Sequence, residues 1–303
     1  MKKSTLLFLT FAMMLATVFA EPAAAKNRYT HTYDFRDFTV LSVSHVFKVE
    51  LTFENRYDVS IDVPDFIEPY LKITKTGEKV RLDLEKLPND IQRKLSDENS
   101  SLLARVSVPK LTRLQLSGAS KVNATGRLVL GGQENFYVSL AGATELNGLV
   151  AEGGEKLAIE ISGASKGDVE AAFNKLDIDL SGASKLRFGG DADQLDIELS
   201  GASSAQFDGK YNGTDADISG SSKLTLTGDS RQLDLELSGA SKFECMGKTA
   251  RATVELSGAS KAKLSVSEKL QYSLSGVSTL RVRNDGAKIS GEASRGSKFE
   301  YLK

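Results

Sequence analysis

The pentapeptide Ser-Gly-Ala-Ser-Lys recurs along this chain at a nearly constant interval, and that interval limits the folds the chain can adopt. Intact copies occur at Ser117–Lys121, Ser162–Lys166, Ser181–Lys185, Ser238–Lys242 and Ser257–Lys261. When degenerate copies are included, the motif ends at 166, 185, 204, 223, 242, 261, 279 and 298, in steps of 19 residues with one step of 18. A unit this short cannot bury a core by itself, so the period predicts a solenoid of stacked coils.

Each unit contains two segments in which apolar and polar residues alternate. One copy reads Leu-Asp-Ile-Asp-Leu over residues 176–180 and Ser-Lys-Leu-Arg-Phe over residues 184–188. Alternation with a period of two is typical of half-buried strands. A polar turn rich in Gly and Asp, at residues 189–194, leads into the next unit. We therefore expect an all-β solenoid with about 19 residues per coil.

The motif itself is interpreted as the corner between the two strands of a coil. Its glycine supplies backbone freedom where the chain changes direction, at Gly163, Gly182, Gly201, Gly220, Gly239 and Gly258. Its second serine lies two residues before an inward apolar residue and should therefore point inward, as at Ser184, Ser203, Ser222, Ser241 and Ser260. These hydroxyls would bond to one another or to the corner backbone, because a buried hydroxyl without a partner is unfavourable. The same parity places Cys245 in the core as a small apolar residue.

Charged residues form outward columns in successive coils. One acidic column contains Asp179, Glu198, Asp217, Glu236 and Glu255, a second contains Asp177, Asp196, Asp215 and Asp234, and a lysine column contains Lys166, Lys185, Lys223, Lys242 and Lys261. These columns would form either a surface that binds cations or a polymer, or a solvated face that resists lateral strand pairing. Like charges about 4.8 Å apart in water repel by only about 1 kcal/mol. We favour the solvated face.

The first 20 residues are predicted to be a signal peptide. Lys2 and Lys3 precede an apolar run, and cleavage would follow Ala20 or fall as late as Ala25. An uncleaved anchor is the alternative, but the run is shorter than the roughly 20 residues that a membrane span needs. The prediction is an exported protein of the periplasm, the outer cell surface or the medium, with no membrane span after cleavage.

Two regions are expected in the mature chain: a β-rich N-terminal region or cap over residues 27–110 and the solenoid over residues 111–303. Loss of Lys2 and Lys3 leaves 37 Lys and Arg against 40 Asp and Glu. This mildly acidic balance argues against a nucleic-acid partner. With Cys245 as the only cysteine, the chain cannot form an internal disulfide.

Residues that would indicate catalysis are scarce. The two histidines, His31 and His45, both precede the regular repeats, and neither lies in a known catalytic motif. No Cys or His spacing suits zinc, and no Gly-rich phosphate loop opens a helix. Carboxylates repeated in equivalent columns do not provide the two different environments that acid/base catalysis needs. We therefore predict no catalytic, cofactor-binding or metal-binding residues, no cofactor, and no enzymatic activity.

The strand pattern over residues 38–63, followed by the repeated pentapeptide, resembles the putative auto-transporter adhesin, head GIN domain family. The resemblance covers roughly residues 38–285 and extends weakly to residue 303. It implies an exported bacterial protein with a right-handed parallel β-helix and a role in cell adhesion. It implies no functional residues.

Three functions remain open at this point. The favoured one is an adhesin-like protein that presents a rigid surface to a glycan or a cell-surface protein. The second is an enzyme that acts on polysaccharides, since a fold alone does not define a function. The third is a structural envelope protein that assembles with copies of itself.

Overall fold

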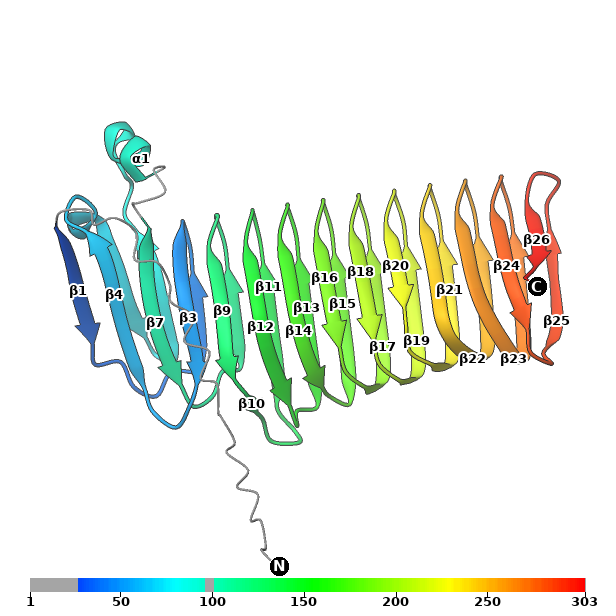
Figure 1. The fold of residues 1–303 in the computed structure, drawn as a ribbon, viewed down its shortest axis with the longest axis horizontal. Helices are drawn as coiled ribbons and strands as arrows, with labels where there is room; N and C mark the ends of the chain where they lie inside the picture. The colour runs from blue at the N-terminus through cyan, green and yellow to red at the C-terminus, as the bar shows by residue number, and fades with distance from the viewer. Residues whose placement is uncertain (1–26, 96–100, 303) are drawn as a thin grey trace, which may run out of the picture.

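The computed structural model describes residues 27–95 and 101–302. It shows a long row of stacked coils with pointed corners along one side and rounded turns along the other (Figure 1). The parallel β-solenoid expected from the 19-residue period is confirmed. The predicted signal peptide, residues 1–20, lies outside the described residues.

Each coil contributes one strand that runs into the corner and one that leaves it. We call the resulting surfaces face A and face B. In spatial order, face A contains β5 (Leu71–Thr76), β6 (Lys79–Leu84), β2 (Val40–Val43), β8 (Arg113–Leu116), β11 (Asn135–Leu140), β13 (Lys156–Ile161), β15 (Lys175–Leu180), β17 (Ala192–Leu199), β19 (Tyr211–Ile218), β21 (Ser230–Leu237), the second halves of β22 (Lys242–Leu256) and β23 (Lys261–Leu274), and β25 (Lys288–Ala293).

Face B contains β1 (Arg28–Tyr33), β4 (Asp58–Pro64), β7 (Leu102–Val108), β3 (Phe47–Phe53), β9 (Lys121–Gly126), β12 (Glu145–Glu152), β14 (Lys166–Ala172), β16 (Lys185–Gly189), β18 (Ser204–Asp208), β20 (Lys223–Leu226), the first halves of β22 and β23, β24 (Thr279–Asn284) and β26 (Lys298–Tyr301). The short β10 (Leu128–Val129) pairs with the end of β12. All these strands belong to one 26-stranded sheet, which continues across residue 110. The expected boundary between an N-terminal region, residues 27–110, and the solenoid, residues 111–303, therefore remains a prediction.

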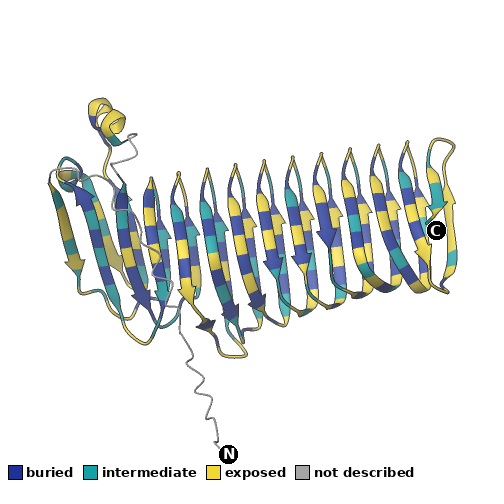
Figure 2. Ribbon diagram, in the orientation of Figure 1, coloured by how far each residue is buried: buried dark blue, intermediate teal, exposed yellow. Residues whose placement is uncertain are grey.

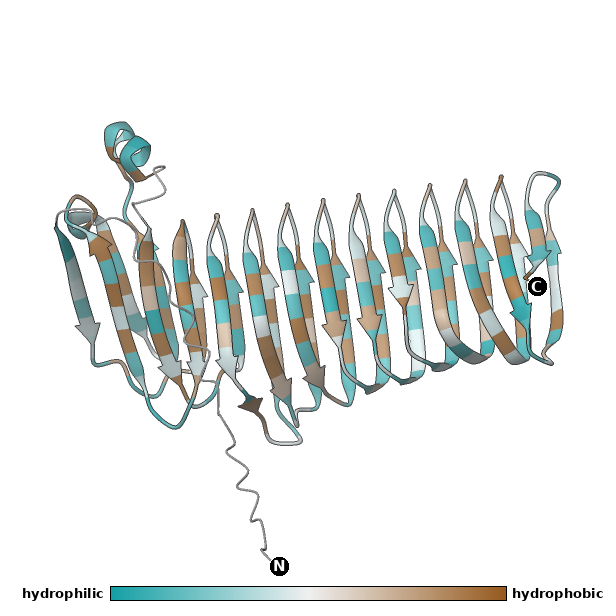
Figure 3. Ribbon diagram, in the orientation of Figure 1, coloured by the Kyte–Doolittle hydropathy of each residue, from teal (hydrophilic) through white to brown (hydrophobic). Residues whose placement is uncertain are grey.

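The register places equivalent residues of successive coils directly above one another. Leu176 of β15 pairs with Leu195 of β17, and Phe188 of β16 pairs with Phe207 of β18. The alternation expected from the sequence is visible as stripes of buried apolar and exposed polar residues along each strand (Figures 2 and 3). The apolar residues of both faces thus form one core that runs the length of the solenoid.

Antiparallel strands occupy the N-terminal end of the stack. β4 pairs antiparallel with both β1 and β7, while β5 and β6 form a hairpin. After β4, the chain passes through the 3-10 helix η1 (Glu68–Tyr70) into β5. The polar excursion between β6 and β7 carries α1 (Asn89–Leu95), which lies beyond the row of corners (Figure 1).

The spatial order of the first coils differs from their order in the chain. β2 and β3 form a coil, residues 40–53, with its own corner at Ser44-His45-Val46. β2 lies between β6 and β8, and β3 lies between β7 and β9. The repeat period did not indicate that these residues form a coil, because their corner has His where the later corners have Gly.

Candidate functional site

The predicted corner glycines lie above one another and have positive φ angles between +66° and +75°. A Cβ at Gly201 would lie 2.6 Å from the carbonyl oxygen of Gly182, in the preceding coil. Three backbone hydrogen bonds connect these two corners, from the N–H groups of Ser200, Ala202 and Ser204. These positions therefore combine a left-handed backbone with close contact between neighbouring coils.

The second serines of the motif are buried, as the alternation indicates; Ser184, Ser203, Ser222, Ser241 and Ser260 are at most 1% exposed. The hydroxyl of Ser184 donates to the carbonyl oxygen of Ser181 at 2.6 Å, three residues earlier in the same corner. Ser203, Ser241 and Ser260 make the same bond at 2.6–2.8 Å. The hydroxyl of Ser222 has no hydrogen-bond partner among the residues that the structure describes.

The acidic columns lie on face A and the lysine column on face B. On face A, Lys156 pairs with Asp177 and Lys175 pairs with Asp196. The next coils have no lysine at the corresponding positions, which are Gln194, Gly213 and Gln232. Burial and the neighbouring carboxylates of Asp217, Asp234 and Asp196 raise the pKa of Asp215 above its ordinary value. The charge of this column is therefore only partly compensated.

A groove follows the edge where face B turns into face A. We call it the turn-edge groove; it has a volume of about 580 Å³ and extends over successive turns between Phe173 and Ser267. Asp191, Lys210, Asp229 and Lys248 form one column along it, and Asp193, Asn212 and Arg231 form a second column beside the first. Side chains from several coils thus line one continuous surface.

The carboxylates of the turn-edge groove are held by the protein itself. Asp191 accepts a hydrogen bond from the backbone N–H of Lys210 at 2.8 Å, and Asp229 accepts the equivalent bond from Lys248 at 2.8 Å. Asp193 accepts a bond from the side-chain amide of Asn212 at 2.8 Å. Each acidic side chain thereby fixes the turn of the following coil.

The basic side chains of the turn-edge groove have no such partners. Lys210, Arg231 and Lys248 are exposed, and none forms an ion pair with any residue that the structure describes. Tyr211 lies beneath them and is 3% exposed, with its hydroxyl donating to the carbonyl oxygen of Gly190 at 3.0 Å. Its burial raises its pKa. The groove therefore offers free cationic donors but no exposed aromatic ring from Tyr211.

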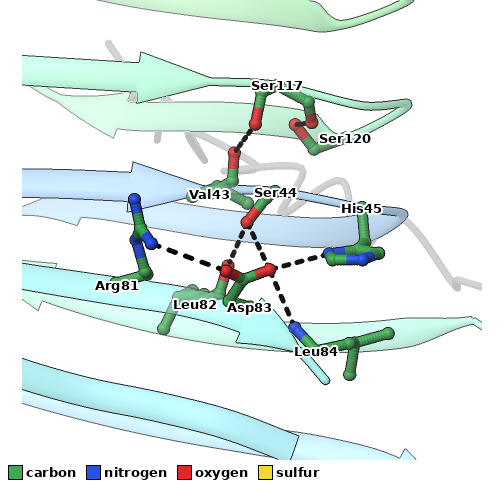
Figure 4. Close-up of polar contacts among 9 residues, drawn as sticks. All are labelled: Val43, Ser44, His45, Arg81, Leu82, Asp83, Leu84, Ser117 and Ser120. Carbon is green, nitrogen blue, oxygen red and sulfur yellow. Dashed lines mark hydrogen bonds and ion pairs between the residues drawn. The ribbon is translucent and has the colours of Figure 1, made fainter. Parts of the chain in front are cut away.

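The structure also brings together polar residues that the sequence did not connect. Asp83 accepts hydrogen bonds from the hydroxyl of Ser44 at 2.8 Å and from the N–H of Leu84 at 2.9 Å, and Nδ1 of His45 lies 2.8 Å from the same carboxylate (Figure 4). Burial alone would raise the pKa of Asp83, but these hydrogen bonds and the charges of His45 and Arg81 lower it.

This cluster contains Ser, His and Asp but lacks the order of a catalytic triad. In a triad the histidine must bond to the serine and be oriented by the aspartate. Here the hydroxyl of Ser44 bonds to Asp83 instead. The other histidine, His31, lies on β1 with Nε2 at 3.2 Å from Glu68.

Two further features concern metals and redox chemistry. No group of three or more His, Cys, Asp or Glu side chains that could hold a metal ion occurs in residues 27–95 or 101–302. Cys245 is 4% exposed, and burial raises the pKa of its thiol. A buried thiol with a raised pKa is a poor nucleophile. Among the described residues, no helix is long and apolar enough to cross a membrane.

These features define an elongated β-solenoid with a polar groove along its turn edge and antiparallel strands at one end. The chain belongs to the family described as putative auto-transporter adhesin, head GIN domain, whose model matches residues 37–211 and again residues 202–286. The resemblance inferred from the pentapeptide and the N-terminal strands is therefore confirmed.

Two solved structures are similar to this chain at low sequence identity. A putative adhesin from Parabacteroides distasonis is 12% identical, with 91% of this chain and 97% of that chain covered and a TM-score of 0.53. A putative adhesin from Parabacteroides merdae is 14% identical, with 92% and 98% covered and a TM-score of 0.47. No curated protein matches the chain. At 12% identity, the similarity to the Parabacteroides distasonis structure shows a shared fold and nothing about function.

Proposed function

We propose that this protein is an exported, non-catalytic, adhesin-like binding protein whose turn-edge groove holds an extended acidic polymer, such as a cell-surface glycan with carboxylate groups. The observation that carries the proposal is the set of exposed cations in the groove, Lys210, Arg231 and Lys248, which form no ion pair with the described residues. Family membership supports the adhesin role. The three cations without ion-pair partners, beside carboxylates that already accept hydrogen bonds, support the choice of an acidic ligand.

The geometry of the groove suits a polymer better than a single small anion. Lys210 and Lys248 belong to alternate coils, so their backbones lie about 10 Å apart, twice the strand spacing. Because Asp191 and Asp229 already accept backbone N–H groups, they hold the turns rigid and are less available to compete for the lysines. A rigid row of donors loses little conformational entropy on binding a repeating ligand.

Glycan arrays that contain acidic and neutral polysaccharides provide the test. We expect the mature protein to bind acidic glycans and to lose this binding in the triple variant Lys210→Glu, Arg231→Glu, Lys248→Glu. The matched control is Lys185→Glu, Lys223→Glu, Lys261→Glu, which changes three exposed lysines of face B by the same charge.

The control variant should retain acidic-glycan binding. Equal loss in both triple variants would mean that net charge, rather than the groove, attracts the glycan. Binding to neutral glycans alone, or unchanged binding in the groove variant, would refute the proposed site. Release of sugar fragments during incubation would refute the non-catalytic role.

We also propose that residues 27–110 form the cap region of the mature protein and that the signal peptide is cleaved off during export. N-terminal sequencing of protein recovered from cell fractions would test the cleavage site. A mature N-terminus at Met1 in cytoplasmic protein would contradict it.

Lateral self-assembly is a second candidate function, favoured by the opposite charges of the two faces. The acidic columns of face A and the lysine column of face B repeat at the same coil spacing. Face A of one copy could therefore match face B of another, and such a heterologous contact gives a ring if the rotation closes and an open filament if it does not. Sedimentation velocity at low and high salt tests this. A monomer at low ionic strength would rule it out.

A further inference from the structure

The coil made by β25 and β26 has open strand edges. Within the part of the chain that the structure describes, these two strands pair on one side only, with β23 and β24 of the preceding coil. The N–H groups of Ser294 and Lys298 donate to carbonyl oxygens of that coil. Because backbone groups point to alternate sides along a strand, those of Ile289, Gly291 and Phe299 point to the open side. An edge of this kind is a template for pairing with another strand.

The apolar core is also less covered in this coil. Val282 of the preceding coil is buried, whereas Tyr301, which pairs with it, is 64% exposed. The half-buried ring of Phe299 stacks on Tyr272 with their centroids 4.7 Å apart, and Tyr301 packs edge-on against Phe299 at 5.1 Å. Aromatic surface thus lies beside the open strand edges, and its burial against another protein would favour association.

Four charged side chains of this coil have no ion-pair partner among the described residues. Asp285 lies in the turn before β25, Lys288 and Glu292 lie on the outer side of β25, and Arg295 lies in the corner after it. All four are exposed. Their order along the chain is acid, base, acid, base. Such an order is self-complementary, because each acid meets a base when a second copy runs in the opposite direction.

An antiparallel copy of β25 brings these opposite charges together. If Ser290 lies opposite Ser290 of a second copy, then Lys288 lies opposite Glu292 of that copy, and Asp285 approaches its Arg295. Opposite charges directly across an antiparallel pair attract, whereas like charges repel. This register also respects the direction of the backbone groups, because the residues on either side of Ser290 are those that point to the open side.

β26 allows the same two-fold arrangement on face B. With Phe299 opposite Phe299 of the second copy, Lys298 lies opposite Glu300 of that copy. The ring of Tyr272, which is one residue out of register with Ser290, contacts Phe299 across the core. A single two-fold axis that passes near Ser290 on face A therefore passes near Phe299 on face B.

We propose that this end of the solenoid is an interface with a second copy of the chain, in which β25 and β26 pair antiparallel with their counterparts. The contact is isologous, since a two-fold axis relates the copies, and it therefore closes at two copies. The aromatic end of each core covers the other. The coil, residues 284–302, matches the lower end of stable interfaces, about 20 residues a side, so we expect a reversible dimer. This surface differs from the lateral contact between faces A and B.

Cysteine crosslinking tests the position of the two-fold axis. Ser290→Cys would place a thiol beside its own counterpart, at the Cα separation of about 4.5 Å of an antiparallel pair that is not hydrogen-bonded. This separation permits a disulfide, so we expect oxidation to produce a covalent dimer on a non-reducing gel. The matched control is Gln271→Cys, which lies in the same outward column one coil further in and should stay monomeric. Cys245 is buried and is present in both variants.

Sedimentation equilibrium over rising protein concentration tests the charge pairs. The mass should rise from one copy to two and stop there. Lys288→Glu and Glu292→Lys should each raise the Kd of the dimer about tenfold, because two like-charged pairs then form in each dimer. The double variant Lys288→Glu, Glu292→Lys should restore the wild-type Kd. Lys261→Glu makes the same charge change two coils further in on face B and should leave the Kd unchanged.

Far-UV circular dichroism would establish that each variant keeps the fold. A folded Ser290→Cys protein that forms no covalent dimer, or equal crosslinking of Gln271→Cys, would overturn the proposal. A mass that continues to grow past two copies would indicate head-to-tail stacking and would overturn the two-fold arrangement. A double charge reversal that dimerises as weakly as the single variants would show that Lys288 and Glu292 do not face each other, and it would overturn the register.

Discussion

Replacement of Gly201 by alanine tests whether the corner column limits which sequences can stack. Gly201 has a φ of +71°, and an alanine in the left-handed region costs about 1–2 kcal/mol. The added Cβ would also lie 2.6 Å from the carbonyl oxygen of Gly182, well inside van der Waals contact. Relief of that overlap requires the two coils to move apart, and such overpacking costs about 1–3 kcal/mol.

The expected loss in free energy of unfolding is therefore about 2–5 kcal/mol for Gly201→Ala. The matched control is Gly189→Ala at the end of β16, where a Cβ would have no neighbouring atom within 4 Å. There the substitution should be neutral or stabilising by up to about 1 kcal/mol, because alanine reduces the entropy of the unfolded chain.

Urea unfolding followed by far-UV circular dichroism would compare the midpoints of the wild type and both variants. The result that would refute the reasoning is a Gly201→Ala protein within about 0.5 kcal/mol of the wild type, or one as stable as Gly189→Ala. Hydrogen exchange at the N–H of Ala202, which bonds to Gly182 at 2.7 Å, would locate the separation of the coils.

Three further predictions follow from the same structure. Asp215→Asn should stabilise the protein at pH 7 by a few tenths to about 1 kcal/mol, since like charges opposite each other in a sheet repel; Asp196→Asn, which removes the partner of Lys175, should not. Because the pKa of Asp215 is raised in the folded state, the wild type should regain this stability as the pH falls toward the ordinary value of 3.8. The urea midpoints of the wild type and Asp215→Asn should therefore converge at low pH, and midpoints that diverge would contradict the prediction. Ser184→Ala should cost about 1 kcal/mol through loss of the bond to Ser181, whereas Ser222→Ala should cost nothing because its hydroxyl is unpaired, and equal urea midpoints for the two variants would count against this. Cys245 should react with a thiol reagent only after unfolding, so rapid labelling of the native protein would show that it is accessible.

The regular part of the fold could be predicted from the sequence because each element repeats a local rule. The alternation at residues 176–180 determines which side chains face the core, and the motif at Ser181–Lys185 determines where the chain turns. Since β13, β15 and β17 pair without a register shift, a correct assignment for one of these coils holds for the next. Local pattern and tertiary structure therefore agree in this region.

The first coils and the turn-edge groove could not be predicted in this way. The coil of residues 40–53 has His45 in place of the corner glycine, so it does not match the repeat, and its neighbours β6 and β8 come from later in the chain. One feature of the sequence could have indicated this coil: the spacing of Ser44 and Lys48 equals that of Ser117 and Lys121 in the motif. The turn-edge groove depends on contacts between turns of variable sequence, such as those of Asp191 and Lys210, which no single repeat contains.

The coil of residues 40–53 lies between two coils that come later in the chain. The two halves of the solenoid should therefore respond differently to deletions. At the C-terminal half, successive coils are added in chain order, so nested deletions that end after a complete coil should remove one layer at a time and lower stability gradually. Deletion of residues 40–53 would instead remove an internal layer and leave β6 and β7 without their parallel partners. Limited proteolysis of such deletion series should therefore find a modular half and an interlocked half within one continuous sheet.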